Sequence, residues 1–281
     1  MFLFYLIQPI KVKSIIYIPK GSLNYTIKKL QKSAVPILSI DKYILKFMGI
    51  PQSGWVDLGN TKNLTKFDFL KRLTTAKSAV KKIVLIPGET DYFIYKKIAQ
   101  TMRFKNFNCS IPEGFLYPET YYLPYNFKKE EVCNYLYNVS LQKHKKISNQ
   151  FFKNWDFNRY YKFLIIASII QKETANKKEM KLVSSVIYNR LLKGMKLQMD
   201  GTLNYGKFSH QKVTPNRIKN DNTKFNTYKF KGLPLKPVCI VSKEAIVAAI
   251  LPAKTDYLYF VRVVGNKHKF SKTYKEHLKN F

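Results

Sequence analysis

Glu173 is the residue of this sequence best placed for acid–base chemistry, because it stands near the end of a long apolar run. The run covers residues 163–174, contains no glycine or proline and is rich in good helix formers, so it predicts a largely buried helix. On that helix the carboxylate shares one face with three isoleucines, Ile166, Ile169 and Ile170. An apolar face destabilises the charged carboxylate and raises its pKa toward the range of a general acid. The alternative is a helix-end glutamate that simply reaches solvent.

Polar side chains are concentrated in the short segment 188–206, which follows a second predicted helix over residues 177–192. A carbohydrate site needs such groups to bind the hydroxyl and amide groups of its ligand. Upstream, segment 111–124 carries three prolines and dense aromatic residues, which suit an irregular wall of a sugar-binding cleft. An ordinary domain-joining loop, partly in the core, is the alternative for that segment. The polar candidates within 188–206 are Asn189, Arg190, Gln198, Asp200 and Thr202.

The composition is that of a globular protein with a very basic charge. Its 281 residues are 46% hydrophobic and 15% aromatic, enough to bury a substantial core. A formal net charge of +33 first suggests an anionic partner such as nucleic acid, a membrane surface or an acidic polymer. The basic residues are mostly lysines spread along the chain, whereas nucleic-acid binding favours arginine or a focused basic stripe. A compositional bias of the source genome is therefore the preferred explanation of the charge.

Neither the cysteines nor the histidines show the spacing of a metal site. The three cysteines are isolated, without the paired spacing of a zinc site or a redox dithiol, and an odd count excludes a fully paired disulfide framework. The four histidines are scattered through the second half of the chain. We therefore expect a mechanism without a metal ion or another cofactor.

The first ten residues are mostly apolar and are followed by Lys11 and Lys13. They are too few to span a bilayer, which takes about 20 residues, and they lack the basic region and cleavage site of a signal peptide. Two readings stay open, namely the end of a truncated membrane anchor within residues 1–11 or a first buried strand.

A strand, a turn and a helix occur twice in the N-terminal third, which predicts an α+β region over residues 12–105. The first copy covers residues 15–30 and the second residues 83–99, with Ser22 and Thr90 at the expected helix N-caps. Further predicted elements are helices over residues 40–47, 66–73 and 130–144, and a strand over residues 55–58.

Several short motifs follow one another through the last two thirds of the chain. They are Glu-Gly-Phe-Leu-Tyr-Pro-Glu-Thr-Tyr (113–121), Ala-Ser-Ile-Ile-Gln-Lys-Glu-Thr (167–174), Tyr-Asn-Arg-Leu (188–191), Gly-Met-Lys-Leu-Gln-Met-Asp-Gly-Thr (194–202), Asn-Thr-Tyr (226–228), Gly-Leu-Pro (232–234) and Pro-Ala-Lys-Thr-Asp-Tyr-Leu-Tyr-Phe-Val (252–261). This order closely resembles the YceG-like family of endolytic murein transglycosylases. The resemblance is clear over residues 111–281 and weaker over residues 12–105, where the family carries a LysM-like glycan-binding module. It implies an α+β chain in which small LysM-like modules precede a mixed α/β catalytic domain at residues 106–281, with one helix carrying the catalytic glutamate.

The resemblance assigns the catalytic role to Glu173, the last acidic residue of the motif at 167–174. Many family members carry a further acid two residues earlier, and here that position is Gln171. Glu173 is therefore the motif's only carboxylate, in agreement with its place on the helix. Another departure is Gly201, which stands where the family usually has proline and which concerns the local loop geometry.

The reaction implied by the resemblance is a non-hydrolytic cleavage of the β-1,4 bond between N-acetylmuramic acid and N-acetylglucosamine inside glycan strands. Glu173 would protonate the glycosidic oxygen and then, as a carboxylate, take the proton of the muramyl C6 hydroxyl while this hydroxyl attacks C1. The product would be a 1,6-anhydromuramyl end. Because the internal hydroxyl replaces water or an enzyme nucleophile, the reaction does not need a second catalytic carboxylate.

We expect further residues of the motifs to bind the substrate or to position Glu173. Glu179 lies six residues after Glu173 and on a different helix face, so a structural ion pair within its helix is the alternative to an assisting role. The expected substrate contacts are Glu113, Glu119, Asn189, Arg190, Gln198, Asp200, Thr202 and Tyr228.

The family's usual architecture implies a protein of the cell inner membrane, with one N-terminal anchor and the catalytic domain in the periplasm. The expected partners are peptidoglycan glycan strands and the cell-wall synthesis machinery, with the enzyme terminating the elongation of nascent strands, and no nucleic acid. Two alternative functions remain, a non-catalytic peptidoglycan-binding protein and a basic nucleic-acid-binding protein.

Overall fold

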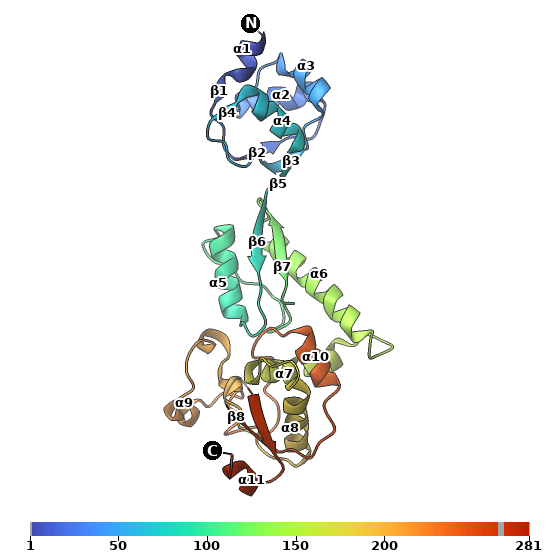
Figure 1. Cartoon of the computed structure of the whole chain (residues 1–281), viewed down its shortest axis with the longest axis vertical. Coiled ribbons are helices and arrows are strands. Elements are labelled where there is room, and N and C mark those ends of the chain that lie inside the picture. The colour runs from blue at the N-terminus through green and yellow to red at the C-terminus, as the bar shows by residue number, and fades with distance from the viewer. Residues whose placement is uncertain (1, 264–266, 281) are drawn as a thin grey trace. The chain divides into compact units, whose positions relative to one another are not determined.

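The structure is a computed structural model that describes residues 2–263 and 267–280. The chain forms two compact units. Unit 1 consists of Met1–Lys82 and Tyr122–Phe127, and unit 2 of Ile83–Tyr121 and Lys128–Phe281. In Figure 1 the elements of unit 1 are blue to blue-green, apart from its short second segment, and those of unit 2 run from green to red. Each unit has its own hydrophobic core.

Unit 1 packs its helices against one face of a small antiparallel sheet. The sheet has the strand order β2-β3-β5, with β2 at Ile15–Ile18, β3 at Gly54–Asp57 and β5 at Lys77–Ser78. A second, two-stranded sheet pairs β1 (Pro9–Ile10) with β4 (Leu64–Thr65). The helices of this unit are α1 (Phe2–Ile7), α2 (Leu23–Lys32), α3 (Asp41–Met48) and α4 (Lys66–Thr75).

Strands β6 (Val80–Val84) and β7 (Thr120–Pro124) pair with each other, and the division between the units runs through both. Helix α5 (Asp91–Met102) follows β6, and helix α6 (Lys129–Ser148) follows β7. These helices, together with the small sheets, give the expected α+β architecture.

A disulfide bond joins Cys109 to Cys133 and ties the loop before β7 to helix α6. The third cysteine, Cys239, is buried and free. The spacing of the cysteines in the sequence did not reveal this pair, because 24 positions separate its two members.

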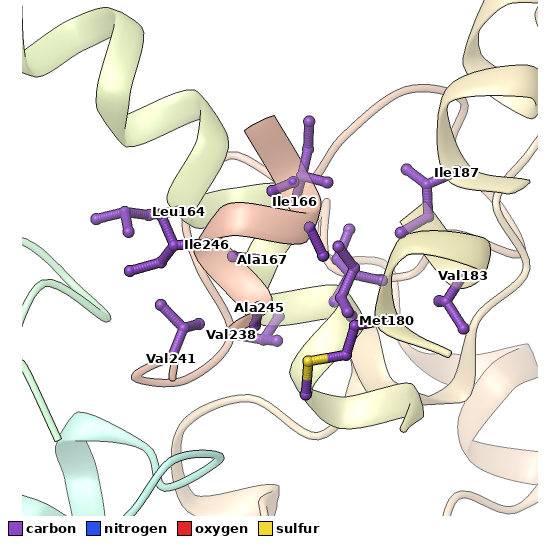
Figure 2. Packing of buried hydrophobic residues seen from close by; sticks show 14 of the residues in the cluster. Leu164, Ile166, Ala167, Met180, Val183, Ile187, Val238, Val241, Ala245 and Ile246 are labelled. Atoms are coloured by element: carbon purple, nitrogen blue, oxygen red, sulfur yellow. The ribbon is translucent and has the colours of Figure 1, made fainter. Parts of the chain in front are cut away.

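The core of unit 2 is built around helix α7 (Phe157–Glu173). Helices α8 (Met180–Leu192) and α10 (Lys243–Ile250) pack against it, and Figure 2 shows Leu164 of α7 beside Ile246 of α10. The remaining elements are the 3-10 helices η1 (Asp200–Leu203) and η2 (Gly206–Phe208), helix α9 (Pro215–Asn220), the paired strands β8 (Tyr259–Val263) and β9 (Lys267–Ser271), and helix α11 (Tyr274–Leu278).

The apolar N-terminal stretch forms the short helix α1 rather than a buried strand. Only Pro9 and Ile10 of this stretch are in a strand, while Leu3 and Phe4 of α1 are largely exposed. The reading as a first buried strand is therefore wrong. Within residues 2–263 and 267–280, every helix is too short or too polar to cross a membrane.

The expected α+β region at residues 12–105 does not coincide with either compact unit. The first strand–turn–helix copy lies in unit 1, whereas helix α5 of the second copy belongs to unit 2. Ser22 caps α2 as expected, because its hydroxyl accepts a hydrogen bond from the backbone N–H of Tyr25. Thr90 occupies the N-cap position of α5, but its hydroxyl donates to the carbonyl oxygen of Gly206 at 2.9 Å instead.

A buried ion pair anchors unit 1. Lys66 Nζ lies 2.6 Å from Asp41 Oδ2, and both side chains are buried. The other carboxylate oxygen, Asp41 Oδ1, accepts a hydrogen bond from the Tyr5 hydroxyl at 2.7 Å. Lys66 Nζ also donates to the carbonyl oxygen of Pro36 at 2.6 Å. A buried charge is costly unless an opposite charge compensates it. The contacts among Tyr5, Asp41 and Lys66 therefore hold helices α1, α3 and α4 together.

We expect Lys66→Met to lower the free energy of unfolding by about 3 kcal/mol, because it leaves the Asp41 carboxylate buried without its counter-charge. Chemical denaturation followed by circular dichroism measures the change. Lys46→Met, which removes an exposed lysine from α3, is the matched control. Equal stabilities of the two variants would contradict the role given to the buried pair.

Candidate active site

Helix α7 is the element that carries the site. Asp156 caps its N-terminus by accepting a hydrogen bond from the backbone N–H of Arg159 at 3.1 Å. Residues 164–170 are buried without exception, so the helix is enclosed by the core almost on all sides. Its C-terminal end therefore holds its position rigidly, and Glu173 is the last residue of that end.

The polar side chains of α7 hold neighbouring segments against the helix. Ser168 Oγ accepts a hydrogen bond from the backbone N–H of Val238 at 3.0 Å. Gln171 Oε1 accepts one from the backbone N–H of Ser242, also at 3.0 Å. Because Ser242 is the N-cap of α10, Gln171 fixes the start of that helix beside the end of α7. Gln171, which stands where many family members have a second acid, thus stabilises the contact between α7 and α10 in this protein.

The carboxyl group of Glu173 is half-buried and has one backbone donor. Its Oε1 accepts a hydrogen bond from the Gly201 N–H at 3.0 Å. Burial raises the pKa of Glu173 to about 7, the Gly201 N–H opposes this rise, and the negative charge of Asp200 adds to it. A carboxyl group with such a pKa can both donate and accept a proton at neutral pH.

Gly201 lies in close contact with the end of α7. A Cβ atom at this position would lie 2.6 Å from Lys172 Cβ and 2.8 Å from Glu173 Oε1, both too short for non-bonded contact. Glycine therefore permits an approach that no other residue allows without displacement. A proline here would also lack the N–H that Glu173 accepts. The departure from proline noted in the sequence thus gives the carboxylate its hydrogen-bond partner.

Thr227 holds the segment that carries Gly201. Its hydroxyl oxygen accepts a hydrogen bond from the Met199 N–H at 3.1 Å and lies 3.0 Å from the hydroxyl of Thr202. Its carbonyl oxygen accepts a further bond from the Gln198 N–H at 3.1 Å. Residues 198–202 are therefore fastened at both ends to the Asn-Thr-Tyr motif.

Asp200 and Tyr228 form a polar pair next to Glu173. The Tyr228 hydroxyl donates to Asp200 Oδ1 at 2.8 Å, and Asp200 is exposed. Burial and the hydrogen bond to Asp200 raise the pKa of Tyr228, so its phenol stays protonated at neutral pH. Of the residues expected at the site, the structure brings Glu173, Asp200 and Tyr228 together.

Asn189, Arg190 and Thr202 are used inside the protein, which differs from the expectation that they contact substrate. Asn189 Nδ2 donates to the carbonyl oxygens of Thr255 and Tyr257 at 2.8 and 2.9 Å. The buried Arg190 donates to the carbonyl oxygens of Leu258 and Leu197 at 2.6 and 2.7 Å, and Thr202 is fully buried. Because backbone acceptors occupy these side chains, we propose that they position the chain around Glu173.

Glu113 and Glu119 have partners of their own. The Glu113 carboxylate accepts the backbone N–H of Asp91 and, together with Tyr205 and Lys236, lines a cavity of about 320 Å³; burial raises its pKa. Glu119 forms an ion pair with Lys143 at 2.7 Å, with both side chains partly exposed. Neither glutamate has a contact with Glu173 among the described residues.

Gln198 and Glu179 are the two remaining candidates. Gln198 is exposed, and its backbone has a φ of 49°, which lies in the left-handed region. Glu179 is the N-cap residue of α8, and its Oε2 lies 2.8 Å from His268 Nδ1 of β9. Glu179 thus has a structural contact, but its partner is His268 of β9 and not a residue of its own helix, as the alternative for Glu179 had predicted.

Sequence reasoning missed the residues that orient the site rather than those that react. Thr227 and Ser168 lie in the motifs at 226–228 and 167–174, and membership of these motifs was the only indication of a role. Their hydrogen-bond partners are backbone groups distant in sequence. The contact of Lys172, whose Nζ donates to Ser209 Oγ at 2.7 Å, was likewise not predicted. In residues 2–263 and 267–280 the histidine, cysteine and acidic side chains form no group of three that could hold a metal ion.

We expect Glu173→Gln to raise the free energy of unfolding at pH 8 by about 1 to 3 kcal/mol. The folded state has a pKa of about 7 for this group, above that of the unfolded chain, so ionisation of Glu173 opposes folding as the pH rises through 7. The gain should shrink as the pH falls and vanish below about 4.5, where both states are protonated. Denaturation curves at pH 8 and pH 4 measure the change.

Glu130→Gln, at an exposed position of α6, is the control. A Glu173→Gln variant whose stability relative to the parent does not change with pH would contradict the burial of this charge.

Comparisons with known proteins relate this chain to one family. The model of the YceG-like family matches residues 16–281. An endolytic murein transglycosylase of Bacillus subtilis (strain 168) is 32% identical over 208 residues, which is 71% of this chain and 57% of that protein. One of Streptococcus pneumoniae serotype 2 is 31% identical over 179 residues, or 60% of this chain and 31% of that protein. The chain thus spans about half or less of these relatives.

A crystal structure of a YceG-like protein from Listeria monocytogenes has the same fold. It aligns with a TM-score of 0.61 at 26% sequence identity and covers 95% of this chain and 98% of that one. Because the family model extends over residues 16–281 and thus over both compact units, this chain belongs to the YceG-like family.

Proposed function

We propose that this protein is an endolytic murein transglycosylase, a lyase that cleaves the bond between N-acetylmuramic acid and N-acetylglucosamine within peptidoglycan strands. The observation that carries the proposal is the half-buried carboxyl group of Glu173, whose pKa is raised to about 7 at the end of a rigid helix. The names of the relatives from Bacillus subtilis and Streptococcus pneumoniae support the same reaction.

In the first step the protonated Glu173 donates its proton to the glycosidic oxygen, and the bond to C1 of the muramyl residue breaks. In the second step the Glu173 carboxylate takes the proton of the C6 hydroxyl while that oxygen forms the bond to C1. The product carries a 1,6-anhydro ring, and Glu173 regains its proton. No water is consumed, and the hydroxyl of the substrate takes the place of a second catalytic carboxylate.

The surroundings of Glu173 suit both steps. Burial favours the protonated acid before the reaction, and the Gly201 N–H stabilises the carboxylate that the first step creates. Asp200 is exposed. Because the Tyr228 hydroxyl donates its hydrogen to Asp200, the phenol oxygen of Tyr228 can accept a hydrogen bond from a sugar hydroxyl. We assign Asp200 and Tyr228 to substrate binding, and Gly201 to the orientation of Glu173.

The other parts of the proposal follow the family resemblance. Unit 1 would serve as the LysM-like glycan-binding module, which its small α+β fold and separate core support. The anchor in the inner membrane, the periplasmic location and the contact with the cell-wall synthesis machinery remain predictions. A non-catalytic peptidoglycan-binding protein is the second candidate, and the presence of Glu173 in a tuned environment argues against it.

We expect Glu173→Gln to reduce the formation of anhydromuramyl ends by about 100-fold or more, because the variant has no proton to donate. Digestion of purified peptidoglycan followed by mass spectrometry of the ends measures the yield. For the parent protein, kcat/KM should decline as the pH rises above about 7, where Glu173 loses its proton before the reaction. Glu130→Gln is the control; a Glu173→Gln variant with the parent's yield would refute the mechanism.

We expect Gly201→Ala to lower kcat by about 10- to 100-fold, because the new Cβ displaces the carboxylate of Glu173 from its productive position. Initial rates on soluble glycan strands measure the effect. Gly194→Ala is a suitable control, since a Cβ there meets no atom within 4 Å although the backbone has a positive φ. A normal kcat in the Gly201→Ala variant would show that this contact does not position Glu173.

A further inference from the structure

Helix α3 of unit 1 carries an apolar stripe on the side that is turned away from the core. Ile40, Tyr43 and Phe47 recur at the spacing of one helical face, and all three are exposed. Phe47 is 94% exposed, and Ile50, which follows the end of the helix, is 79% exposed. Together with the exposed Leu38 these residues form a surface that we call the α3 patch.

The opposite side of α3 already fastens the helix to unit 1. Leu45 is fully buried in the core, and Ile44 and Met48 pack against that core. Asp41 is also buried and is paired with Lys66. Single exposed apolar residues are common on protein surfaces, but the five of the α3 patch lie within 13 residues and are each more than half exposed. Such a concentration indicates a contact with another apolar phase.

Lysines border the α3 patch. Lys42 and Lys46 are four residues apart on α3, and their Nζ atoms lie 4.8 and 5.9 Å from the centroid of the Tyr43 ring. Residues 1–82 contain 15 lysines and arginines, but three aspartates and no glutamate. The surroundings of the patch are therefore strongly positive.

This charge decides between the possible occupants of the patch. Two copies of the chain that met through it would bring Lys42 and Lys46 of both copies together, and the like charges would oppose such a dimer. A bilayer with anionic headgroups offers an apolar layer for the exposed side chains and negative charge for the lysines. Lysine side chains can lie along apolar surface with their stems and still extend the ammonium group to a headgroup.

We propose that the α3 patch is a contact with a membrane surface, in which Tyr43, Phe47 and Ile50 enter an anionic phospholipid bilayer while Lys42 and Lys46 bind its phosphates. With eight residues, α3 lies in the interface and does not cross the bilayer. The contact is separate from the predicted N-terminal anchor, because residues 38–50 make it and no spanning helix takes part. It also does not depend on the proposed function.

Co-sedimentation of the full chain with phosphatidylcholine vesicles that contain phosphatidylglycerol tests the apolar part of the contact. We expect Phe47→Ser to weaken binding by about 10-fold, because a large apolar side chain no longer enters the interface. Leu192→Ser is the matched control, since it removes an 85% exposed leucine from α8 in unit 2. Equal binding of Phe47→Ser and Leu192→Ser would overturn the proposal.

The same assay tests the charged part of the contact. We expect the double variant Lys42→Gln/Lys46→Gln to weaken binding by about 10-fold, because each lysine near an anionic surface adds to the affinity. Lys145→Gln/Lys146→Gln removes the same charge from exposed positions of α6 and is the control. Vesicles of phosphatidylcholine alone should bind the parent protein weakly. Equal binding of the two double variants would contradict the role of the lysines beside the patch.

Tryptophan fluorescence shows whether the patch enters the bilayer. We expect the added emission of Phe47→Trp to be quenched by brominated phospholipids, and that of Leu192→Trp to remain unchanged. The parent protein, with Trp55 and Trp155, gives the background. Added emission of Phe47→Trp that brominated lipids leave unchanged would overturn the insertion.

Two further outcomes would assign the binding differently. Leu3 and Phe4 of α1 are exposed as well, so binding lost in Phe4→Ser but kept in Phe47→Ser would place it at the N-terminal stretch and overturn the proposal. A dimer that depends on Phe47 in sedimentation equilibrium, without vesicle binding, would assign the α3 patch to a second copy. Thermal unfolding of Phe47→Ser should match that of Leu192→Ser; if it does not, the lysine double variants decide the outcome.

Discussion

The partial burial of one carboxyl group, that of Glu173, is the constraint on which the proposed active site depends. Removing Glu173 from water raises its pKa to about 7, and a carboxyl group with this pKa can act as both the acid and the base of the proposed reaction near neutral pH. The Gly201 N–H keeps the shift from going further and gives the carboxylate a fixed orientation. The protonation of this carboxyl group therefore depends on a balance between lost hydration and one backbone donor.

Helix α7 fixes the position of Glu173, and it also holds the neighbouring segments in place through hydrogen bonds. Ser168 and Gln171 hold the segment that leads into α10, and Lys172 holds the loop at Ser209. From α8, Asn189 and Arg190 bind the backbone of the segments near 255–258 and 196–197. Most conspicuous polar residues of the motifs therefore bind backbone groups, whereas Asp200 and Tyr228 bind each other and are the pair that we propose for the ligand.

The sequence was a good guide to local structure and a poor guide to the partners of polar side chains. Helices α2, α3 and α6 lie close to their predicted bounds because their apolar periodicity, and in α2 the cap at Ser22, are local properties. Helix α7 begins at residue 157 rather than 163, since Asp156 caps it and aromatic residues extend its apolar face.

The burial of the isoleucine face of α7 was also predictable, because it depends on periodicity alone. The tasks of Asn189, Arg190 and Thr227 were not predictable, because a polar residue type does not tell whether its partner is a ligand or a distant carbonyl group. The contact of Gly201 with Glu173 joins positions that only the tertiary fold brings together, and the same holds for the disulfide.

The disulfide between Cys109 and Cys133 has a consequence for how the chain acquires its covalent structure. Such a bond forms in oxidising surroundings, where any accessible third thiol could compete in exchange reactions. Burial excludes Cys239 from this competition, and it also raises the pKa of that thiol to about 12, so that almost no thiolate is present at neutral pH. Once the core around α7 has formed, the buried Cys239 can no longer attack the disulfide between Cys109 and Cys133. Packing therefore protects this disulfide from thiol–disulfide exchange.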